Sequence, residues 1–429
     1  IQAGAVNLTG KLVMRASARA EDSAVAELAR LIEVGEQGRS GFVRIADRAA
    51  ALYVPVVHSL ALLTFCGWLL APVVAHALGF AFAPVGIHGA LQNAVAVLII
   101  TCPCALGLAV PAVQVVATGR LFTHGVLVKS GDALERLAQV NVVVFDKTGT
   151  LTRGKPRLVN TVTPDVLAAA ANLARASRHP LSRAIVETAG PGAVAAGAVE
   201  IAGAGIEASS DGRIVRLGRR TFAAPEMPDS GDGAAELWFA DGASAPLRFV
   251  FEDAVKADAV ATIAALRARG LEAHLISGDR PAAAEACARG VGIQSWQAQV
   301  SPSEKIAYIR ALRLRGLRPL MVGDGLNDAA ALAAAHASAS PGTAVQASQA
   351  AADIVFQGDL LAPVVEAIDV ARRARARALE NLRFSAAYNL IAAPAAAFGF
   401  LTPLIAALAM SGSSLIVTLN ALRMQLERR

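Results

Sequence analysis

Two long stretches of the chain carry no charged side chain, and they constrain the fold more than any other feature. Residues 49–119 contain no Asp, Glu, Lys or Arg, and neither do residues 384–422. Because a helix needs about 20 apolar residues to cross a bilayer, each stretch is long enough for two crossings. The whole chain is 55% hydrophobic and 17% charged, which is too apolar for water-soluble domains alone. We expect one pair of membrane helices near residues 52–74 and 91–113, and a second near 384–401 and 403–422.

Basic residues flank both uncharged stretches. They are Arg39, Arg44, Arg48, Arg120 and Lys129 around the first, and Arg372, Arg373, Arg375, Arg377, Arg383, Arg423, Arg428 and Arg429 around the second. Since Lys and Arg collect at the cytoplasmic ends of membrane helices, both pairs should enter and leave on the cytoplasmic side, in contact with membrane lipid. The net charge of +6 does not indicate nucleic-acid binding, because the basic residues border membrane helices.

Between the two stretches, a short apolar run ends in an acidic residue. Residues 142–145 suit a strand buried on both faces, and Asp146 stands where that strand would end. In an open parallel sheet, functional groups gather at the carboxyl ends of the strands. Lys147 and Thr148 follow, with backbone amides around Gly149 that can hold a phosphate. Asp146 is therefore a candidate carboxylate nucleophile.

Later segments place more polar residues where neighbouring strands would end. The apolar run at 273–276 leads into a turn, and the run at 320–322 leads into Gly-Asp-Gly-Leu-Asn-Asp. Carboxylates after a buried strand suit Mg²⁺, which prefers oxygen ligands, and a lysine can offset phosphate charge. The candidates for catalysis are Ser277, Gly278, Asp279, Lys305 and Asn327. The candidates for binding the metal are Asp324 and Asp328.

The run Asp-Lys-Thr-Gly-Thr-Leu-Thr at residues 146–152 resembles the phosphorylation motif of the P-type ATPases, membrane pumps that form an aspartyl-phosphate. The resemblance implies a multi-domain membrane α + α/β protein that uses ATP and Mg²⁺. Its transmembrane helices would accompany a haloacid-dehalogenase-like phosphorylation domain with an inserted α+β nucleotide-binding domain. The implied boundaries are an actuator remnant at 1–40, transmembrane pairs at 41–116 and 371–429, the phosphorylation domain at 117–152 and 249–370, and the nucleotide-binding domain at 153–248.

Two short elements in the inserted region resemble the nucleotide-binding elements of that family. One is the pair His179 and Pro180, and the other is a Gly-x-Gly formed by Gly203 and Gly205. The resemblance implies that His179 stacks on adenine and that the glycines let the backbone approach the nucleotide. The chain departs from the family in one respect, because Arg178 stands where a glutamate usually precedes the histidine.

The second expected membrane helix contains Cys102, Pro103 and Cys104. On a regular helix, side chains two residues apart point about 200° apart. Pro103 removes an amide and crowds the preceding turn, so we expect a locally open helix in which two thiolates face one cavity. The motif resembles the Cys-Pro-Cys of heavy-metal P-type ATPases. Four cysteines, two of them in this motif, do not indicate a disulfide framework.

The last uncharged stretch holds further candidate ligands. They are Tyr388 and Asn389, and Met410 and Ser414, which are four residues apart on one helix face. Thiolates, a thioether and neutral oxygens suit Cu⁺. The Tyr-Asn pair and the Met-x-x-Ser-Ser pattern resemble those of copper-transporting members, in which an acidic residue like Asp47 lies where the metal enters from the cytoplasm. A solvated start of a helix explains Asp47 equally well.

Within that family, the residues around the Cys-Pro-Cys motif and residues 402–410 look like the subtype that supplies copper for bacterial cytochrome oxidase assembly. This resemblance implies export of Cu⁺ across the bacterial inner membrane, with the catalytic domains in the cytoplasm. The implied partners are a copper chaperone and cytochrome oxidase assembly factors.

Three alternatives remain open at this stage. The first is that the ion is Zn²⁺ or Cd²⁺, although a divalent ion would favour an added carboxylate. A membrane-tethered phosphatase would need only Asp146 and Asp324. A non-pumping fragment is the third, because Thr9-Gly10 is followed by Lys11, whereas the family has Thr-Gly-Glu in its actuator domain. We accordingly expect an amino-terminally truncated chain that cannot by itself complete a transport cycle.

Overall fold

The structure is a computed structural model, and it describes residues 41–78, 85–102, 104–201, 203–210, 212–228, 234–325, 328–344 and 346–426. The actuator remnant expected at residues 1–40 lies outside this part of the chain. The described residues form two compact units. The first contains residues 41–139, 353–355 and 366–426, and the second contains residues 140–352 and 356–365.

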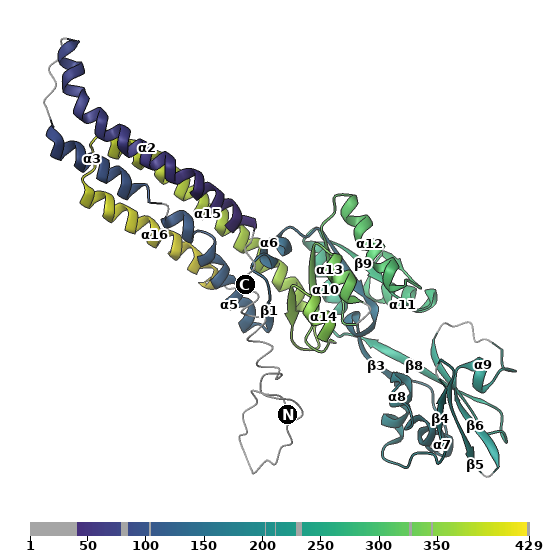
Figure 1. The fold of residues 1–429 in the computed structure, drawn as a ribbon. Helices are drawn as coiled ribbons and strands as arrows, with labels where there is room; N and C mark the ends of the chain where they lie inside the picture. Colours follow the sequence, from purple (N-terminus) through teal and green to yellow (C-terminus); the bar gives the residue numbers. More distant parts are fainter. Residues whose placement is uncertain are drawn as a thin grey trace, which may run out of the picture. The chain divides into compact units, whose positions relative to one another are not determined.

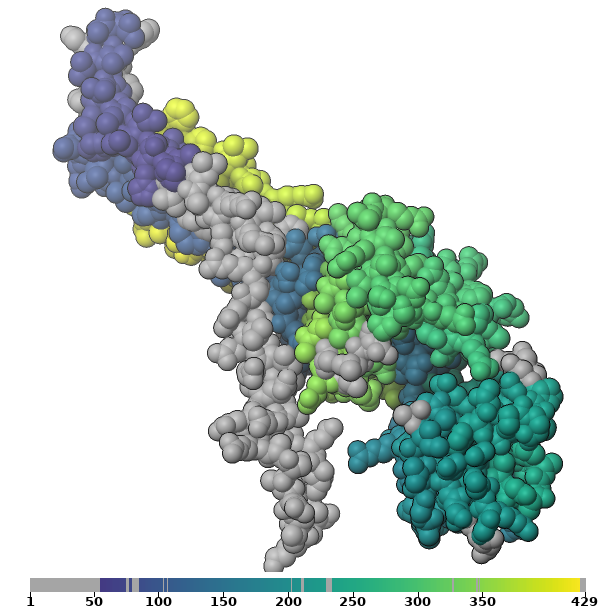
Figure 2. Space-filling model, turned by 45° about the vertical axis from the view of Figure 1, so that its right-hand side comes forward, coloured from purple at the N-terminus to yellow at the C-terminus, as the bar shows by residue number. Residues whose placement is uncertain are grey.

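The first unit is built mainly from long apolar helices (Figure 1). Its elements are α2 (Gly41–Ala77), α3 (Gly86–Ile100), α4 (Cys104–Leu108), α5 (Pro111–Thr123), β1 (Val126–Val128), α6 (Ala133–Ala138), most of α15 (Ala362–Ala397) and of β13 (Ile354–Phe356), and α16 (Pro403–Leu426). The side chains of α2 and α3, purple and blue, lie side by side in Figure 2. By length and composition, Pro55–Val74 and Pro403–Met424 are long and apolar enough to span a membrane, whereas α3 is shorter.

Large apolar side chains point outward from these helices. Leu63 on α2 is 68% exposed, Leu390 on α15 is 77% exposed and Leu404 on α16 is 70% exposed. Soluble proteins rarely expose apolar patches of this extent. The outward faces of the helices are therefore suited to lipid.

The helix predicted near 91–113 is interrupted twice. It ends at Ile100, resumes at Cys104, stops again after Leu108 and resumes at Pro111. Interruption near Pro103 agrees with the sequence-based expectation. Freed backbone groups need partners in a bilayer. The Asn381 side chain of α15 supplies one, since its Nδ2 donates to the Ala109 carbonyl at 3.2 Å and to the Val417 carbonyl of α16 at 3.3 Å.

The second unit contains a parallel sheet flanked by helices, as the sequence predicts. Its five neighbouring strands follow the order β12-β11-β2-β9-β10. Their bounds are β2 (Val142–Asp146), β9 (Glu272–Ile276), β10 (Ser295–Gln297), β11 (Pro319–Val322) and β12 (Ala337–Pro341). The helices are α10 (Ala259–Ala268), α11 (Pro281–Val291), α12 (Pro302–Leu314), α13 (Ala329–Ala334) and α14 (Gln346–Ala351). Every residue of β2 is buried, which explains its unbroken apolar run.

An antiparallel sheet is inserted after β2. Its strand order is β3-β8-β7-β6-β5-β4. The strands are β3 (Thr152–Leu158), β4 (Val199–Ile201), β5 (Gly205–Ser210), β6 (Arg213–Gly218), β7 (Ala235–Ala240) and β8 (Leu247–Val255). The helices are α7 (Pro164–Ala174), α8 (Pro180–Ala189) and α9 (Arg220–Ala223). Apolar residues of α7 and α8 pack with Phe239, Phe249 and Phe251 of the sheet in one core.

We expect Phe249→Ala to destabilise the inserted sheet by about 3–5 kcal/mol, because it leaves a cavity in a core where Phe249 is fully buried. Urea unfolding followed by near-ultraviolet circular dichroism measures the change. Ile214→Ala on β6 is the control, since Ile214 is 57% exposed and its loss should cost less than about 1 kcal/mol. Equal destabilisation by both variants would contradict this description of the core.

Candidate active site

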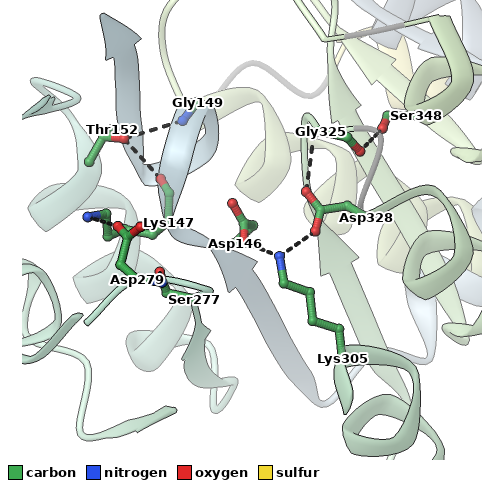
Figure 3. Close-up of polar contacts among 10 residues, drawn as sticks. All are labelled: Asp146, Lys147, Gly149, Thr152, Ser277, Asp279, Lys305, Gly325, Asp328 and Ser348. Carbon is green, nitrogen blue, oxygen red and sulfur yellow. Dashed lines mark hydrogen bonds and ion pairs between the residues drawn. The ribbon is translucent and has the colours of Figure 1, made fainter. Parts of the chain in front are cut away.

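Asp146 ends β2 at the carboxyl edge of the parallel sheet, where it meets a lysine and a second aspartate (Figure 3). Lys305 Nζ lies 2.6 Å from Asp146 Oδ1 and 2.7 Å from Asp328 Oδ1. All three side chains are buried. Lys305 is positioned by the first turn of α12, which a capping box fixes: Ser301 Oγ accepts from Glu304 N, and Ser301 N donates to Glu304 Oε2.

A third carboxylate completes the cluster. Oxygen atoms of Asp146, Asp324 and Asp328 lie within 4.8 Å of one another. Asp324 follows β11 and lies against Gly149, where a Cβ atom would come within 1.7 Å of Asp324 Oδ2. Gly149 also has φ +70°, a conformation that favours glycine. Three crowded carboxylates, two of them bonded to the Lys305 ammonium, form an oxygen-rich site that fits a divalent cation such as Mg²⁺.

Burial and the closeness of the carboxylates shift the pKa values of Asp146, Asp324 and Lys305. Burial raises the pKa of Asp146 from 3.8 to about 7, and the Asp328 carboxylate adds to the rise. Burial and Asp328 likewise raise the pKa of Asp324 to about 6. Burial alone would lower the pKa of Lys305, but Asp146 and Asp328 outweigh it and hold the pKa above its usual value. Lys305 is therefore a permanent cation between two acids.

The loop after Asp146, residues Lys147–Leu151, is held from both sides. Lys147 forms an ion pair with Asp279, which follows β9. Thr152 Oγ1 accepts from Gly149 N at 3.3 Å and lies 2.5 Å from Asp253 Oδ2. Sequence analysis missed Asp253, which also accepts from the amides of Gly154 and Lys155 at 3.2 Å each. The one hint in the sequence to the role of Asp253 was that an acidic residue lies on the strand that leads back to the parallel sheet.

The other predicted catalytic residues lie around this loop, with one exception. Ser277 is buried at the end of β9, and its Oγ accepts from Asp279 N at 3.1 Å. Gly278 separates them, and Thr148 is exposed on the loop. Asn327 lies outside the described residues. The described candidates Asp146, Lys147, Asp279 and Lys305 thus share one edge of the sheet.

Three of the four predicted nucleotide-binding residues, all except Pro180, line a cavity of about 1120 Å³ in the second unit. Its wall includes His179, Gly203 and Gly205 together with Lys147 and Asp279. His179 Nδ1 accepts from Leu181 N at 3.3 Å, so a neutral ring carries its proton on Nε2. Pro180 is the first residue of α8.

Packing between two strands also requires a glycine at position 205. A Cβ atom there would lie 2.4 Å from the Leu217 carbonyl of β6, so β5 and β6 approach closely only because this position is glycine. The glycine pattern alone did not reveal this strand contact.

The membrane candidates lie in the first unit. Cys102 and Cys104 are joined as a disulfide, with their Cα atoms 5.5 Å apart. The expectation of two free thiolates is therefore wrong for this form of the chain, although the sulfurs do share one side of the broken helix, because the interruption removes the regular helical rotation.

The stretch of α16 beside this break carries the next candidates. Ile100 packs in one cluster with Ala406, and Ala105 packs in another with Val417, so Met410 and Ser414 lie on the part of α16 between those contacts. Tyr388 stacks on Phe384 along α15, and Asn389 Oδ1 is buried without a hydrogen-bond partner among the described residues. Asp47 lies on α2, but its side chain is outside the described part.

Sequence analysis also missed Asn381. It is buried on α15, and its Oδ1 accepts a hydrogen bond from Asn420 Nδ2 of α16 at 2.9 Å. A signal was present, because Asn381 precedes Tyr388 by seven residues and so shares its helix face.

The raised pKa of Asp146 predicts how its substitution changes stability with pH. The folded chain binds this proton more tightly than the unfolded chain, so the stabilisation is full below pH 3.8 and is lost as the pH rises through about 7. Asp146→Asn stays neutral. Its thermal stability relative to the unmodified chain should therefore increase between about pH 4 and about pH 7 without Mg²⁺, and the difference should level off at higher pH.

Differential scanning calorimetry across that pH range measures the effect. Asp165→Asn is the control, since Asp165 is exposed at the start of α7 and should give no such trend. A pH-independent difference between Asp146→Asn and the unmodified chain would contradict the assigned burial of this carboxyl.

Comparison with known proteins agrees with this geometry. The sequence profile of a hydrolase family, haloacid dehalogenase-like hydrolase, matches residues 140–336. Nitrogen fixation protein FixI of Bradyrhizobium diazoefficiens is 47% identical over 437 residues, covering 100% of this chain and 58% of FixI. A probable copper-exporting P-type ATPase V of Mycobacterium tuberculosis is 38% identical over 442 residues, covering 98% of this chain and 56% of the relative.

Among solved structures, the crystal structure of a zinc-transporting PIB-type ATPase in the E2.Pi state matches with a TM-score of 0.73 at 29% identity, covering 95% of this chain and 68% of that one. The chain thus spans a little over half the length of the two curated relatives. The similarity extends over both the parallel-sheet domain and the apolar helices. With the phosphorylation motif at Asp146 and the shared fold, it establishes that the chain belongs to the heavy-metal P-type ATPases.

Proposed function

We propose that this chain forms the catalytic and part of the transmembrane portion of an ATP-driven exporter of Cu⁺ that works through a phosphorylated aspartate. The observation that carries the proposal is the position of Asp146, buried at a strand end between Lys305 and the Asp324–Asp328 pair. An acid with only a structural role at the surface does not require burial beside a lysine. A nucleophile that attacks a phosphate needs nearby positive charge and exclusion of water.

The proposed transfer uses groups that are already in place. Lys305 holds Oδ1 of Asp146, which leaves Oδ2 as the oxygen that attacks the γ-phosphorus of ATP. The bond from the γ-phosphorus to the bridging oxygen breaks, and ADP leaves with that electron pair. Lys147, opposite Asp279, and the loop amides stabilise the negative charge on the transferred group.

Asp324 and Asp328 are the residues that would hold Mg²⁺. When bound, Mg²⁺ neutralises phosphate charge and orients the transferring group. Burial and the neighbouring Asp328 raise the pKa values of Asp146 and Asp324, and a bound divalent cation would favour the charged form of these carboxyl groups.

We expect ATP with Mg²⁺ to label residues 1–429 covalently, giving a product that is stable in acid and labile to hydroxylamine. Asp146→Asn should reduce the label to background, because its amide cannot attack phosphorus. Asp165→Asn, at an exposed carboxyl away from the site, should retain the label. Persistent label in Asp146→Asn would assign the nucleophile to another residue.

For the transported ion, the support lies in the chemistry of the candidate ligands. Once reduced, Cys102 and Cys104 would offer two thiolates beside the stretch of α16 that carries Met410. Soft sulfur ligands favour Cu⁺. Tyr388, Asn389 and Ser414 add neutral oxygens, and Asp47 is the proposed acid where the metal enters. Delivery by a copper chaperone and a role in cytochrome oxidase assembly rest on sequence resemblance and stay predictions.

Anaerobic Cu⁺ titration of the reduced chain, in competition with a chromogenic chelator, should reveal a tight site. The double variant Cys102→Ser with Cys104→Ser should lower the affinity for Cu⁺ by more than about 100-fold. Loss of a residue that only hydrogen-bonds to a metal ligand typically lowers the affinity by roughly 10- to 100-fold. The matched control is Cys66→Ser with Cys287→Ser, which removes the two cysteines outside the motif. Tighter competition by Zn²⁺ than by Cu⁺ would favour the divalent alternative.

A further inference from the structure

A hydrogen-bonded chain joins the His179 turn to an acidic residue on β4. The amide of His179 donates to Ser177 Oγ at 3.0 Å, and Ser177 Oγ donates to Glu200 Oε1 at 2.5 Å. Ser177 is buried, whereas Glu200 is exposed on the edge strand of the inserted sheet. Ser177, His179 and Glu200 all line the large cavity. A carboxylate is therefore fixed beside the histidine of the proposed nucleotide pocket.

Three of the four other acids in the cavity wall are already engaged, and the fourth, Glu252, lies on β8. Glu236 pairs with Arg248 at 2.5 Å, Asp279 pairs with Lys147, and Asp253 holds Thr152 and two amides. Glu200 instead accepts a hydrogen bond from the uncharged hydroxyl of Ser177. A carboxylate has about four acceptor sites, so the bond from Ser177 leaves capacity for another donor.

The cavity has a phosphate side and a base side. Lys147, Gly278 and Asp279 come from the domain that carries Asp146, so phosphates belong there. His179 and Glu200 come from the inserted sheet and its helices, where the base of the same nucleotide would lie. The residue before the histidine is Arg178, which has no acceptor, so it cannot serve a base that presents an amine.

We propose that Glu200 determines base specificity by accepting a hydrogen bond from the 6-amino group of adenine. This inference rests on the proposed binding of ATP in the cavity. A 6-keto purine presents an acceptor at the same position, so the carboxylate repels it and the pocket rejects it. Ser177 acts as the positioning residue, because its hydroxyl fixes the carboxylate relative to the His179 turn.

The test compares ATP with inosine triphosphate, which carries a 6-keto group in place of the amine. Each nucleotide displaces a fluorescent ATP analogue from residues 1–429, without Mg²⁺ so that no phosphate is transferred. The unmodified chain should prefer ATP by about tenfold, the scale of one hydrogen bond to a charged group. Glu200→Gln should bring the preference close to one, because an amide can donate to the keto oxygen or accept from the amine.

Glu187→Gln is the matched control, since Glu187 is exposed on α8 and does not line the cavity, and it should keep the preference of the unmodified chain. An unchanged preference in Glu200→Gln, with ATP binding retained, would overturn the role of Glu200 alone. Loss of all nucleotide binding in Glu200→Gln would also overturn it, because Glu200 would then be needed for the fold. Failure of the unmodified chain to bind ATP would overturn the proposed nucleotide pocket and this inference together.

Discussion

The carboxyl edge of the parallel sheet that carries Asp146 depends on the buried ammonium group of Lys305. This group lies between Asp146 and Asp328, and without it the two buried carboxylates would face each other with no cation bonded to either. The strands deliver the acids because parallel strands end at the same edge, and α12 delivers the lysine because its capping box fixes the first turn. Charge balance at this point thus requires the sheet, the helix and their register to be correct together.

The same edge is joined covalently to the inserted sheet. The loop after Asp146 runs directly into β3, and Asp253 on the returning strand β8 clamps Thr152 and the first amides of β3. These two strands are the connections through which the chain leaves and re-enters the parallel-sheet domain. A change in the conformation of the loop would therefore first displace β3 and β8. Through these strands it would displace the inserted domain that carries His179 and Glu200.

Sequence alone predicted the features that depend on neighbours along the chain. The strand ending at Asp146 and the interruption near Pro103 follow from local pattern, whereas the inserted region was expected from the family resemblance. The bridge from Lys305 to Asp328, the clamp by Asp253 and the bond from Ser177 to Glu200 join residues separated by 23, 101 and 23 positions. Such contacts are set by strand register and helix packing, which periodicity does not encode. The pairing of Cys102 with Cys104 was also missed, because it depends on the shape of the interrupted helix.

Asn381 gives the broken helix a further meaning. Its amide group reaches the Ala109 carbonyl at the second interruption and the Val417 carbonyl of α16, while Asn420 bonds its oxygen. In hydrocarbon, an unravelled turn without such a partner would tend to close again, since unsatisfied carbonyls are costly there. The hydrogen bonds of Asn381 instead hold the interruption open without help from a ligand. An ion that binds beside it, as proposed above, would meet a preformed gap and need not spend its binding energy on unwinding the helix.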